Sequence, residues 1–420
     1  TTARRDNWRH KFDDNWVVKD SAPGGPANGT VIPSFNGHVA RLLWLGTEDR
    51  GVLKCHSREK MCRNLASWRT KMSEEACNRL NGSWLAQLSM AMLPHIDAPL
   101  ISAFVKRWQP DTNSFHLGEM TIMLHDVWYI LRIPIERHLV DDQSSIDALK
   151  GHVAELFGMP VGDLTGGPDG GESHWAGGGL TRWLFLLLGC TLFVDKSGNK
   201  IRPRDIVEAL EPDSIHEFSW GSAALAYLYR QLGMASRQPH RERHVIGPGY
   251  PRSMLWNVRC EDKSTARLLS IRRQLDMLQA SEVDWMPYRT DPSKDVLRTL
   301  MVGCIRYCDI VEPYMPDRSL RQLGRVQVVP MDILAPEFAM RPGTPVNKYS
   351  VKHSSAFANW AWRNFPYSTV LHLQNYDVAM DPGKSAPDYL LWYTHHSHPR
   401  LLRDSQTSSH HGGPDRSDTE

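Results

Sequence analysis

The stretch FHLGEMTIMLHDVWYILRIP, residues 115–134, brings together four side chains that could do chemistry: His116, Glu119, His125 and Asp126. Imidazoles and carboxylates can hold a zinc ion or transfer protons in acid and base catalysis. A zinc-binding helix requires the pattern His-Glu-x-x-His on one helical face. Here Glu119 lies between two histidines that are nine residues apart and belong to different predicted elements. The spacing therefore predicts no cluster of metal ligands.

A turn and a helix must position these side chains. Residues 115–122 are predicted to form two short strands around Leu117–Gly118, because glycine supplies the positive φ that a two-residue turn needs. From Leu124 the apolar spacing becomes helical, and Pro134 ends the helix. Asp126 falls on the third helical position, where a carboxylate meets free backbone amides.

This corner of the chain is predicted to be structural. Its aromatic residues Trp108 and Phe115 are expected to be buried, whereas Glu119 and Asp126 are expected to stabilise turns or helix ends. Replacing both acids by amides should then lower stability without removing a bound metal ion.

Other stretches that resemble catalytic motifs lack an essential residue. The glycine-rich stretch 161–179 has no lysine where a phosphate-binding loop requires one, which favours a long connecting loop. GDLTG at 162–166 is similar to the first metal motif of metallophosphatases, but Thr165 stands where the histidine ligand belongs and no partner motif follows. The turn after the next apolar run fails as an EF-hand loop, because Ile206 replaces the required acid.

Composition indicates a globular protein without a strong electrostatic field. The chain has 420 residues, and 49 Lys and Arg against 47 Asp and Glu give a formal net charge of +2. No long-range attraction to nucleic acid or membranes is therefore expected. A hydrophobic content of 41% with 15 tryptophans argues against a mainly disordered chain. The apolar run 183–194 is shorter than the roughly 20 residues that span a bilayer, and we expect a buried core element in a soluble protein.

Cysteine usage and the N-terminus bear on the compartment. The seven cysteines are an odd number without a Cys-x-x-Cys pair, which favours reduced thiols in an intracellular protein. Residues 1–16 are charged throughout and lack the apolar centre of a signal peptide. Because the sequence does not begin with methionine, a fragment or a processed product is expected.

Helical periodicity of apolar residues dominates the chain. It runs through residues 38–104 and recurs at 220–235, where Ser219 can cap the helix and an apolar stripe faces the core. Residues 315–324 are predicted to form a short helix that Asp317 caps and a glycine ends. The expected fold class is mainly α, a globular helical domain with a few short β-hairpins.

A further helix is predicted over residues 264–280. Its inward side chains are Leu268, Ile271, Leu275 and Leu278. Its partly outward arginines are Arg267, Arg272 and Arg273. Such a basic face is more often solvated than bound to nucleic acid.

The stretch RWQPDTNSFHLGEMTIMLHDVWYILRIPI, residues 107–135, resembles the signature of the plant mobile domain family, also labelled aminotransferase-like. Six further blocks are similar to the family, occur in its order and cover roughly residues 35–365: GVLKC, LISAFVKRW, DKSGNKI, SWGSAALAYLYRQL, VDWMPY and MPDRSLRQLG. The resemblance marks these residues as structural parts of the family motif: Trp108, Phe115, His116, Leu117, Gly118, Glu119, Met120, Thr121, Asp126, Ser219, Trp220, Gly221, Pro316, Asp317, Arg318, Arg321 and Gln322.

The resemblance implies a nuclear protein. Similar proteins include maintenance-of-meristems factors, nuclear proteins linked to the silencing of transposable elements, and copies carried by plant retrotransposons. Some family members are fused to a serine/threonine phosphatase or act with one. We therefore expect a non-catalytic protein-interaction module, possessing protein partners and no membrane association. The alternative is a transposon-derived nucleic-acid-binding protein whose helix near Arg272 contacts phosphates, and an enzyme of unknown chemistry is a third interpretation.

The family brings no agreed catalytic residues, so no catalytic, cofactor-binding or metal-binding residue is predicted. Pyridoxal phosphate, which an aminotransferase requires, needs a Schiff-base lysine, an acid at the ring nitrogen and a phosphate cup. The candidates Lys196 and Lys294 lie in polar turns without a glycine-rich cup nearby. The residues therefore do not support the aminotransferase label, and no cofactor is expected.

Four segments are expected along the chain. They are a flexible N-terminal tail at 1–31, the plant mobile domain at 32–365 with its long glycine-rich loop 161–179, a C-terminal extension at 366–404 and a disordered tail at 405–420.

Two departures from the family pattern stand out. The turn before Glu119 is two residues shorter than usual, and Met123 replaces the usual capping Thr or Asp. Between Arg243 and Pro251 a tryptophan-rich helix of the family is missing. A helix that buries about four large side chains contributes about 6 to 12 kcal/mol. We therefore predict a mis-spliced or decaying copy with weakened function, unless NWAWRNF at 359–365 fills the gap.

Overall fold

Helices supply most of the described structure. The computed structural model describes residues 25–26, 32–55, 59–81, 83–90, 96–140, 179–193, 215–237, 262–288, 297–308, 310–333, 355–365, 370–381 and 383–403. The α-helices are α2 (Val39–Leu45), α3 (Glu59–Arg69), α4 (Glu74–Asn81), α5 (Trp84–Met90), α6 (Ala98–Val105), α7 (Leu124–Leu131), α10 (Gly179–Thr191), α11 (Trp220–Arg237), α12 (Thr265–Met277), α13 (Ser355–Arg363) and α14 (Tyr389–His396).

Short 3-10 helices and two hairpins complete the described part. The 3-10 helices are η1 (Pro33–Gly37), η5 (Ile215–Glu217), η7 (Ala280–Glu282), η8 (Leu297–Leu300), η9 (Pro316–Leu323) and η10 (Leu373–Asn375). The strands are β1 (Trp108–Gln109), β2 (Ser114–Phe115), β3 (Gly303–Tyr307) and β4 (Ile310–Tyr314). They pair as two antiparallel sheets, β1 with β2 and β3 with β4. The predicted fold class, mainly α with short hairpins, is confirmed.

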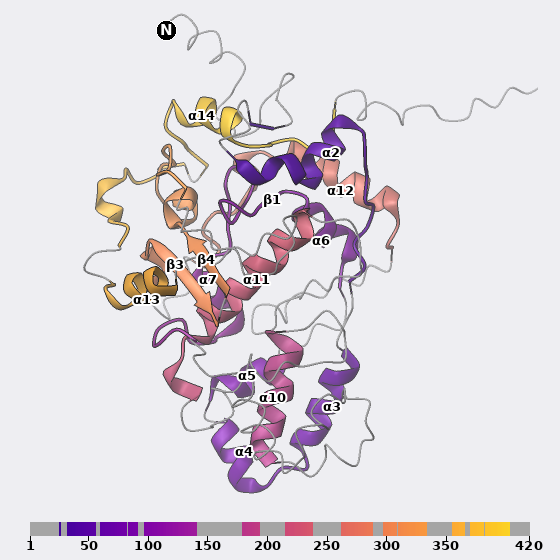
Figure 1. The fold of residues 1–420 in the computed structure, drawn as a ribbon, viewed down its shortest axis with the longest axis vertical. Coiled ribbons are helices and arrows are strands. Elements are labelled where there is room, and N and C mark those ends of the chain that lie inside the picture. The colour runs from indigo at the N-terminus through magenta and orange to yellow at the C-terminus, as the bar shows by residue number, and fades with distance from the viewer. Residues whose placement is uncertain are drawn as a thin grey trace, which may run out of the picture.

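Helix α11 lies at the centre of the molecule, with the β3–β4 hairpin and helices α6 and α7 around it (Figure 1). The predicted stripe faces the core, because Leu225, Tyr229 and Leu232 are at most 5% exposed. The predicted helix over residues 220–235 is therefore confirmed.

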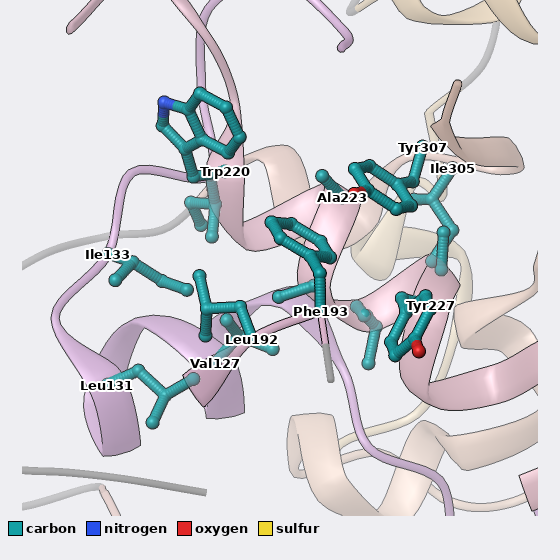
Figure 2. Packing of buried hydrophobic residues seen from close by; sticks show 14 of the residues in the cluster. Val127, Leu131, Ile133, Leu192, Phe193, Trp220, Ala223, Tyr227, Ile305 and Tyr307 are labelled. Atoms are coloured by element: carbon teal, nitrogen blue, oxygen red, sulfur yellow. The ribbon is translucent and has the colours of Figure 1, made fainter. Parts of the chain in front are cut away.

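Aromatic rings join α11 to its neighbours (Figure 2). Phe193, just after α10, stacks on Tyr307 of β3 with ring centroids 4.0 Å apart, and Tyr227 of α11 meets both rings edge-on. The Trp220 ring lies 6.1 Å from Phe193. Ring pairs in these geometries stabilise a fold by about 0.5–1.5 kcal/mol beyond the burial of their surface.

Helix α10 holds the apolar run predicted to be a buried core element. It lies with α3, α4 and α5 in the lower part of the molecule (Figure 1). Leu184, Leu187 and Leu188 are at most 1% exposed, so the prediction of burial is confirmed. Among the described residues no helix is long and apolar enough to cross a membrane.

The first hairpin lies before the predicted one. Trp108 pairs with Phe115 and Gln109 with Ser114, around a four-residue polar connection that ends in Asn113 at a φ of 48°. Residues 115–122 were expected to form two strands, but they form only a single bridge between Phe115 and Met120. The ladder does not continue because the backbone N and O of the next residue, Thr121, both bond to the Gln322 side chain.

Helix α12 begins at its predicted cap, since the Ser264 side chain accepts from Arg267 N. Leu268 and Ile271 are buried as predicted. Arg272, however, was expected partly outward and is only 1% exposed. Its guanidinium forms a bidentate ion pair with Asp49, at 2.7 and 2.8 Å, from the loop after α2. Helical periodicity could not reveal this partner because it lies 223 residues away.

The stretch at 315–324 forms the 3-10 helix η9, and Gly324 ends it with a φ of 70°. The predicted cap is wrong. Asp317 lies inside the helix, and its Oδ2 accepts from Met331 N at 2.8 Å. Because Pro316 occupies the first helical position, Met315 becomes the flanking residue and Asp317 is turned inward.

The stretch NWAWRNF lies on α13 and packs against β3. Trp362 is buried, and its Nε1 donates to Arg137 O at 2.6 Å, whereas Trp360 is 50% exposed. The segment between Arg243 and Pro251 lies outside the described residues, so the missing helix stays a prediction. The N-terminal tail apart from residues 25–26, the tail 405–420, the glycine-rich stretch apart from its last residue and the turn at 195–201 also lie outside the described residues.

Candidate functional site

The family motif forms a tight turn over residues 115–121. Phe115 N donates to Met120 O at 2.7 Å, and Met120 N donates back to Phe115 O at 3.2 Å. The φ angles of Gly118 and Glu119 are 84° and 54°, both left-handed. Glycine adopts this conformation freely, as predicted, whereas a glutamate is strained in it. Contacts from elsewhere in the fold must hold Glu119 there.

The 3-10 helix η9 docks on this turn and satisfies its backbone. Gln322 forms a two-way amide bridge, because its Oε1 accepts from Thr121 N and its Nε2 donates to Thr121 O, both at 2.9 Å. Arg321 Nη1 donates to Gly118 O at 3.0 Å. Two motif blocks about 200 residues apart in sequence are thereby joined. We call the assembly of residues 115–121, 316–322 and 389–398 the motif junction.

Glu119 and Arg318 form an ion pair inside the motif junction. Arg318 Nη1 donates to Glu119 Oε1, and their side chains are 5% and 2% exposed. Ser319 Oγ donates to the backbone oxygen of Glu119 at 3.1 Å. Burial raises the pKa of Glu119, and the Arg318 guanidinium acts in the opposite direction. Glu119 lies in a turn, as expected, and its left-handed backbone places its carboxylate in a buried ion pair that sequence spacing did not reveal.

Helix α14 closes the other side of the turn. Tyr393 OH accepts from Gly118 N at 3.0 Å, and Tyr389 OH donates to Gly118 O at 3.3 Å. The guanidinium of Arg321 lies 5.1 Å from the ring centroids of both Trp285 and Tyr389, in cation–π geometry. Sequence reasoning missed both tyrosines. Their only signal was a spacing of one helical turn in an aromatic segment.

Three imidazoles meet beside the turn: His38, His116 and His398 all have no exposed surface. The His398 ring lies 4.3 Å from that of His116 and 4.9 Å from that of His38. His116 Nδ1 accepts from His398 N at 3.1 Å. His38 Nδ1 accepts from Ala40 N at 3.1 Å, and its Nε2 donates to Trp108 O at 2.7 Å. Because an imidazolium has no acceptor nitrogen, His38 and His116 are neutral in this arrangement.

The surroundings of this histidine trio oppose protonation. Burial lowers the pKa of His116 and His398 well below the ordinary value of 6.5. The neighbouring histidines, Arg318 beside His116 and Arg107 beside His398 lower these pKa values further. Both nitrogens of His398 and the Nε2 of His116 have no hydrogen-bond partner within the described part. The trio is therefore a place where added protons destabilise the fold.

The remaining residues of the opening stretch confirm the structural prediction. Trp108 has no exposed surface and Phe115 is 9% exposed. Asp126 Oδ2 accepts from Met123 N at 2.7 Å, so it stabilises the start of α7 as expected. His125 lies beside it, with Nε2 3.6 Å from Asp126 Oδ1. The four side chains that could do chemistry are thus divided between the trio, the ion pair and a helix start.

A second motif block, Ser219 to Gly221, anchors the start of α11. Trp220 Nε1 donates to Ile215 O at 2.7 Å, and Gly221 N donates to Pro134 O at 2.6 Å. The Ser219 hydroxyl was expected to cap the helix, but it has no hydrogen-bond partner among the described residues. The capping prediction is therefore wrong. The backbone of Ser219, whose N donates to His138 O at 2.7 Å, holds this segment instead.

Replacing Gly221 by alanine should destabilise the fold. A Cβ there would lie 2.5 Å from the Ile135 side chain and 2.9 Å from Pro134 O. Because the second atom belongs to the backbone, it cannot move aside, and we expect a loss of about 1–3 kcal/mol in thermal or urea unfolding. Gly37→Ala is the matched control, since nothing lies within 4 Å of its Cβ position. Equal melting temperatures for the two variants would contradict the close approach.

Arg107, the first residue of the motif stretch, ties the C-terminal segment to the junction. Its Nη2 donates to Asp276 Oδ1, and Arg107 has no exposed surface. Asp276 also accepts from Leu401 N at 3.2 Å and from Leu402 N at 3.1 Å. Sequence reasoning missed this pair because Asp276 falls within an amphipathic helix, where a charge suggests a solvated face.

The described residues contain no group of three or more His, Cys, Asp or Glu side chains able to hold a metal ion. The lysines considered for a Schiff base, Lys196 and Lys294, lie outside them. Lys106 is a further candidate for a Schiff-base lysine, which sequence reasoning missed. Burial lowers its pKa to about 7. Lys106 is 2% exposed, and its Nζ donates to Gly51 O at 2.6 Å. This contact gives the side chain a structural role.

Comparisons with known proteins agree with the motif. The plant mobile domain profile matches residues 82–245 and 235–394. Protein MAIN-LIKE 2 of Arabidopsis thaliana is 27% identical over 88% of this chain, and Protein MAINTENANCE OF MERISTEMS of the same plant is 29% identical over 72%. The chain spans 61% of the length of the first and 72% of the second.

A more distant relative is the serine/threonine-protein phosphatase 7 long form homolog of Arabidopsis thaliana, 25% identical over 88% of this chain and 31% of its own length. No solved structure matches. The profile match covers well over half of the chain, and the junction joins residues of its two matched segments. This chain therefore belongs to the plant mobile domain family.

Proposed function

We propose that this chain is a non-catalytic nuclear module that binds protein partners and serves in meristem maintenance and the silencing of transposable elements. The observation that carries the proposal is the internal use of the motif's polar side chains. Glu119 pairs with Arg318, and Gln322 bridges to Thr121. Residues engaged in this way hold a scaffold together. The similarity to Protein MAINTENANCE OF MERISTEMS supports the biological process.

A serine/threonine phosphatase is the proposed partner. The support is the relative named as a phosphatase long form, of which this chain spans 31% while the match covers 88% of the chain itself. Because this chain spans less than a third of a relative that is named as a phosphatase, we propose that a module of this kind and a phosphatase act together as separate chains. Catalysis would then belong to the phosphatase.

The proposal is tested by affinity purification from plant nuclei followed by mass spectrometry. The full chain carrying a tag is compared with Gly221→Ala, which weakens the fold, and Gly37→Ala, which leaves it intact. We expect the wild type and Gly37→Ala to retain a serine/threonine phosphatase, and Gly221→Ala to retain less of it. Exclusion of a fluorescent fusion from nuclei, or the same proteins recovered with an unrelated tagged protein, would contradict the proposal.

Nucleic-acid binding is the second candidate, and the helix near Arg272 is its motivation. The two arginines of α12 that could best contact phosphates already have acidic partners. Arg272 pairs with Asp49, and Arg267 pairs with Asp97 at 2.6 Å. A salt titration of duplex DNA binding separates the two functions. Phosphate contacts would appear as a steep loss of affinity with salt, whereas a protein-binding module should show no affinity even at low salt.

A further inference from the structure

One surface of the molecule is assembled from three separate segments. Residues 324–327 pair on one side with residues 377–379, through Val326 N to Asp377 O at 2.9 Å and Ala379 N to Gly324 O at 3.1 Å. On the other side Gln327 N donates to Lys384 O at 3.2 Å, and Ala386 N donates to Gln327 O at 2.7 Å. These bonds hold the segment around residues 324–327 and the segment around residues 377–386 side by side.

The remaining segment, residues 277–288, begins with the last residue of helix α12 and lies against both others. A Cβ on Gly383 would lie 2.8 Å from Ala280, and a Cβ on Gly324 would lie 2.8 Å from Met286 Sδ. We call residues 277–288, 324–333, 376–381 and 383–388 together the methionine surface.

The methionine surface carries most of the large apolar side chains that stand exposed in the described part. They are Met277 at 68%, Met331 at 51%, Val378 at 62% and Met380 at 94% exposure. Met380 is therefore almost completely in contact with solvent. Methionine is flexible and polarisable, and surfaces that bind partners of varied sequence use it for that reason.

The same segments are rich in exposed acidic residues. The exposed carboxylates are those of Glu282, Asp284, Asp332, Asp377, Asp381 and Asp388. The same segments contain two basic residues, Arg325 and Lys384, and Arg325 Nη1 is directed to Tyr376 O at 3.4 Å. The surface is thus negative in a chain whose formal net charge is +2.

We propose that the methionine surface is the docking site for a basic amphipathic segment of a protein partner. The inference rests on the proposed function and adds the chemistry of the partner. The methionines contact the apolar face of the segment, and the carboxylates attract its lysines and arginines. Nucleic acid and anionic lipid are disfavoured here, because both would meet carboxylates of their own sign.

The test uses the full chain with carbon-13 in its methionine methyl groups and a synthetic helical peptide of lysine and leucine. During an NMR titration we expect the Met331 and Met380 signals to shift. Signals of Met123 and Met301, which have no exposed surface, should stay in place. A peptide of the same composition in scrambled order should bind at least about tenfold more weakly, since it lacks an apolar face.

Two double variants at exposed positions locate the binding. Met331→Gln with Met380→Gln removes the apolar contacts, whereas Asp377→Asn with Asp381→Asn removes two charges. Each double variant should bind the peptide about tenfold more weakly. Trp360→Gln is the matched control, because Trp360 is 50% exposed on α13 outside this surface. Because all five side chains are at the surface, the variants are expected to fold. Only the charge variant should also reduce the salt dependence of binding, because four of the six carboxylates remain.

Several results would overturn the proposal. They are unchanged affinity in both variants, equal binding of the scrambled peptide, or binding without shifts of Met331 and Met380. Shifts that depend on protein concentration without peptide would identify a second copy as the occupant. If the nuclear phosphatase binds wild type and both variants equally, the methionine surface is not the docking site, while the proposed function stands. If peptide binding follows the surface but no nuclear partner is recovered, the proposed function fails instead.

Discussion

Replacing Glu119 by glutamine is expected to lower the free energy of unfolding by about 3–5 kcal/mol, the cost of leaving one partner of a buried ion pair unmatched. Arg318 would remain in the core, with a side chain 5% exposed and a charge that it cannot lose. The same change also removes an acceptor of the Tyr389 hydroxyl. Urea unfolding followed by tryptophan fluorescence measures the effect. Glu75→Gln on the exposed side of α4 is the control and should shift stability by less than about 0.5 kcal/mol.

The reverse variant, Arg318→Met, should respond to pH in a different way. Without the guanidinium, burial raises the pKa of Glu119 without opposition from Arg318. A carboxyl with a raised pKa is destabilising above its unfolded value of 4.5 and becomes neutral as the pH falls. The deficit of Arg318→Met relative to wild type should therefore shrink from pH 7 to pH 5, while that of Glu119→Gln, which lacks the titrating carboxyl, should not shrink. Parallel pH profiles for the two variants would argue against a buried ion pair.

The structural role of the corner has a further check. Glu119→Gln combined with Asp126→Asn should lower stability without changing the metal content of the protein. Metal analysis of both proteins measures this. Stoichiometric zinc in the wild type that disappears from the double variant would overturn the assignment of these acids to an ion pair and a helix start.

Acidification from pH 7.5 to pH 5 is expected to cost about 4 kcal/mol of stability through His116 and His398, about 2 kcal/mol for each. Their folded pKa values lie well below 6.5, so the unfolded chain binds more protons in this range. Stability is therefore complete above pH 6.5 and is lost as the pH falls below it. Melting temperatures measured across this range, at constant ionic strength, record the loss.

Two single-histidine variants, one inside the trio and one outside it, test the source of this pH dependence. His398→Phe places a ring beside Phe35, which already stacks on this position at 5.2 Å, and should remove about half of the pH dependence. His372→Gln changes an exposed histidine and should leave the profile unchanged. Lys106 does not interfere, because a lysine with a pKa lowered to about 7 affects stability mainly above that pH. A profile that His398→Phe leaves unaltered would exclude the trio as its source.

Helices with long apolar stripes were predictable from the sequence, and the reason is local. Leu225, Tyr229 and Leu232 recur at helical spacing, so any fold that buries one of them on a helix buries all three. The start of α7 was predictable too, because Asp126 and Met123 are neighbours along the chain. The first hairpin was misplaced by a few residues, since a single glycine signal could belong to more than one turn.

The candidate site divides in the same way. Gly118 was predicted to adopt a positive φ and does so, because the constraint acts on one residue. The destinations of Glu119, Asp317 and Arg272 were wrong or incomplete. Each has a partner from a distant segment, and sequence spacing carries no information about which distant charge will be its neighbour.

The sequence by itself determined the family, the helical class and the buried faces of the main helices, because these depend on motifs and on periodicity within single segments. Only the tertiary structure decided that the motif blocks converge, with the amide of Gln322 on Thr121 and the guanidinium of Arg318 on Glu119. It also decided that His38, His116 and His398 meet from three parts of the chain. The physical reason is that burial makes these polar groups dependent on one another, and burial is a property of the packed chain.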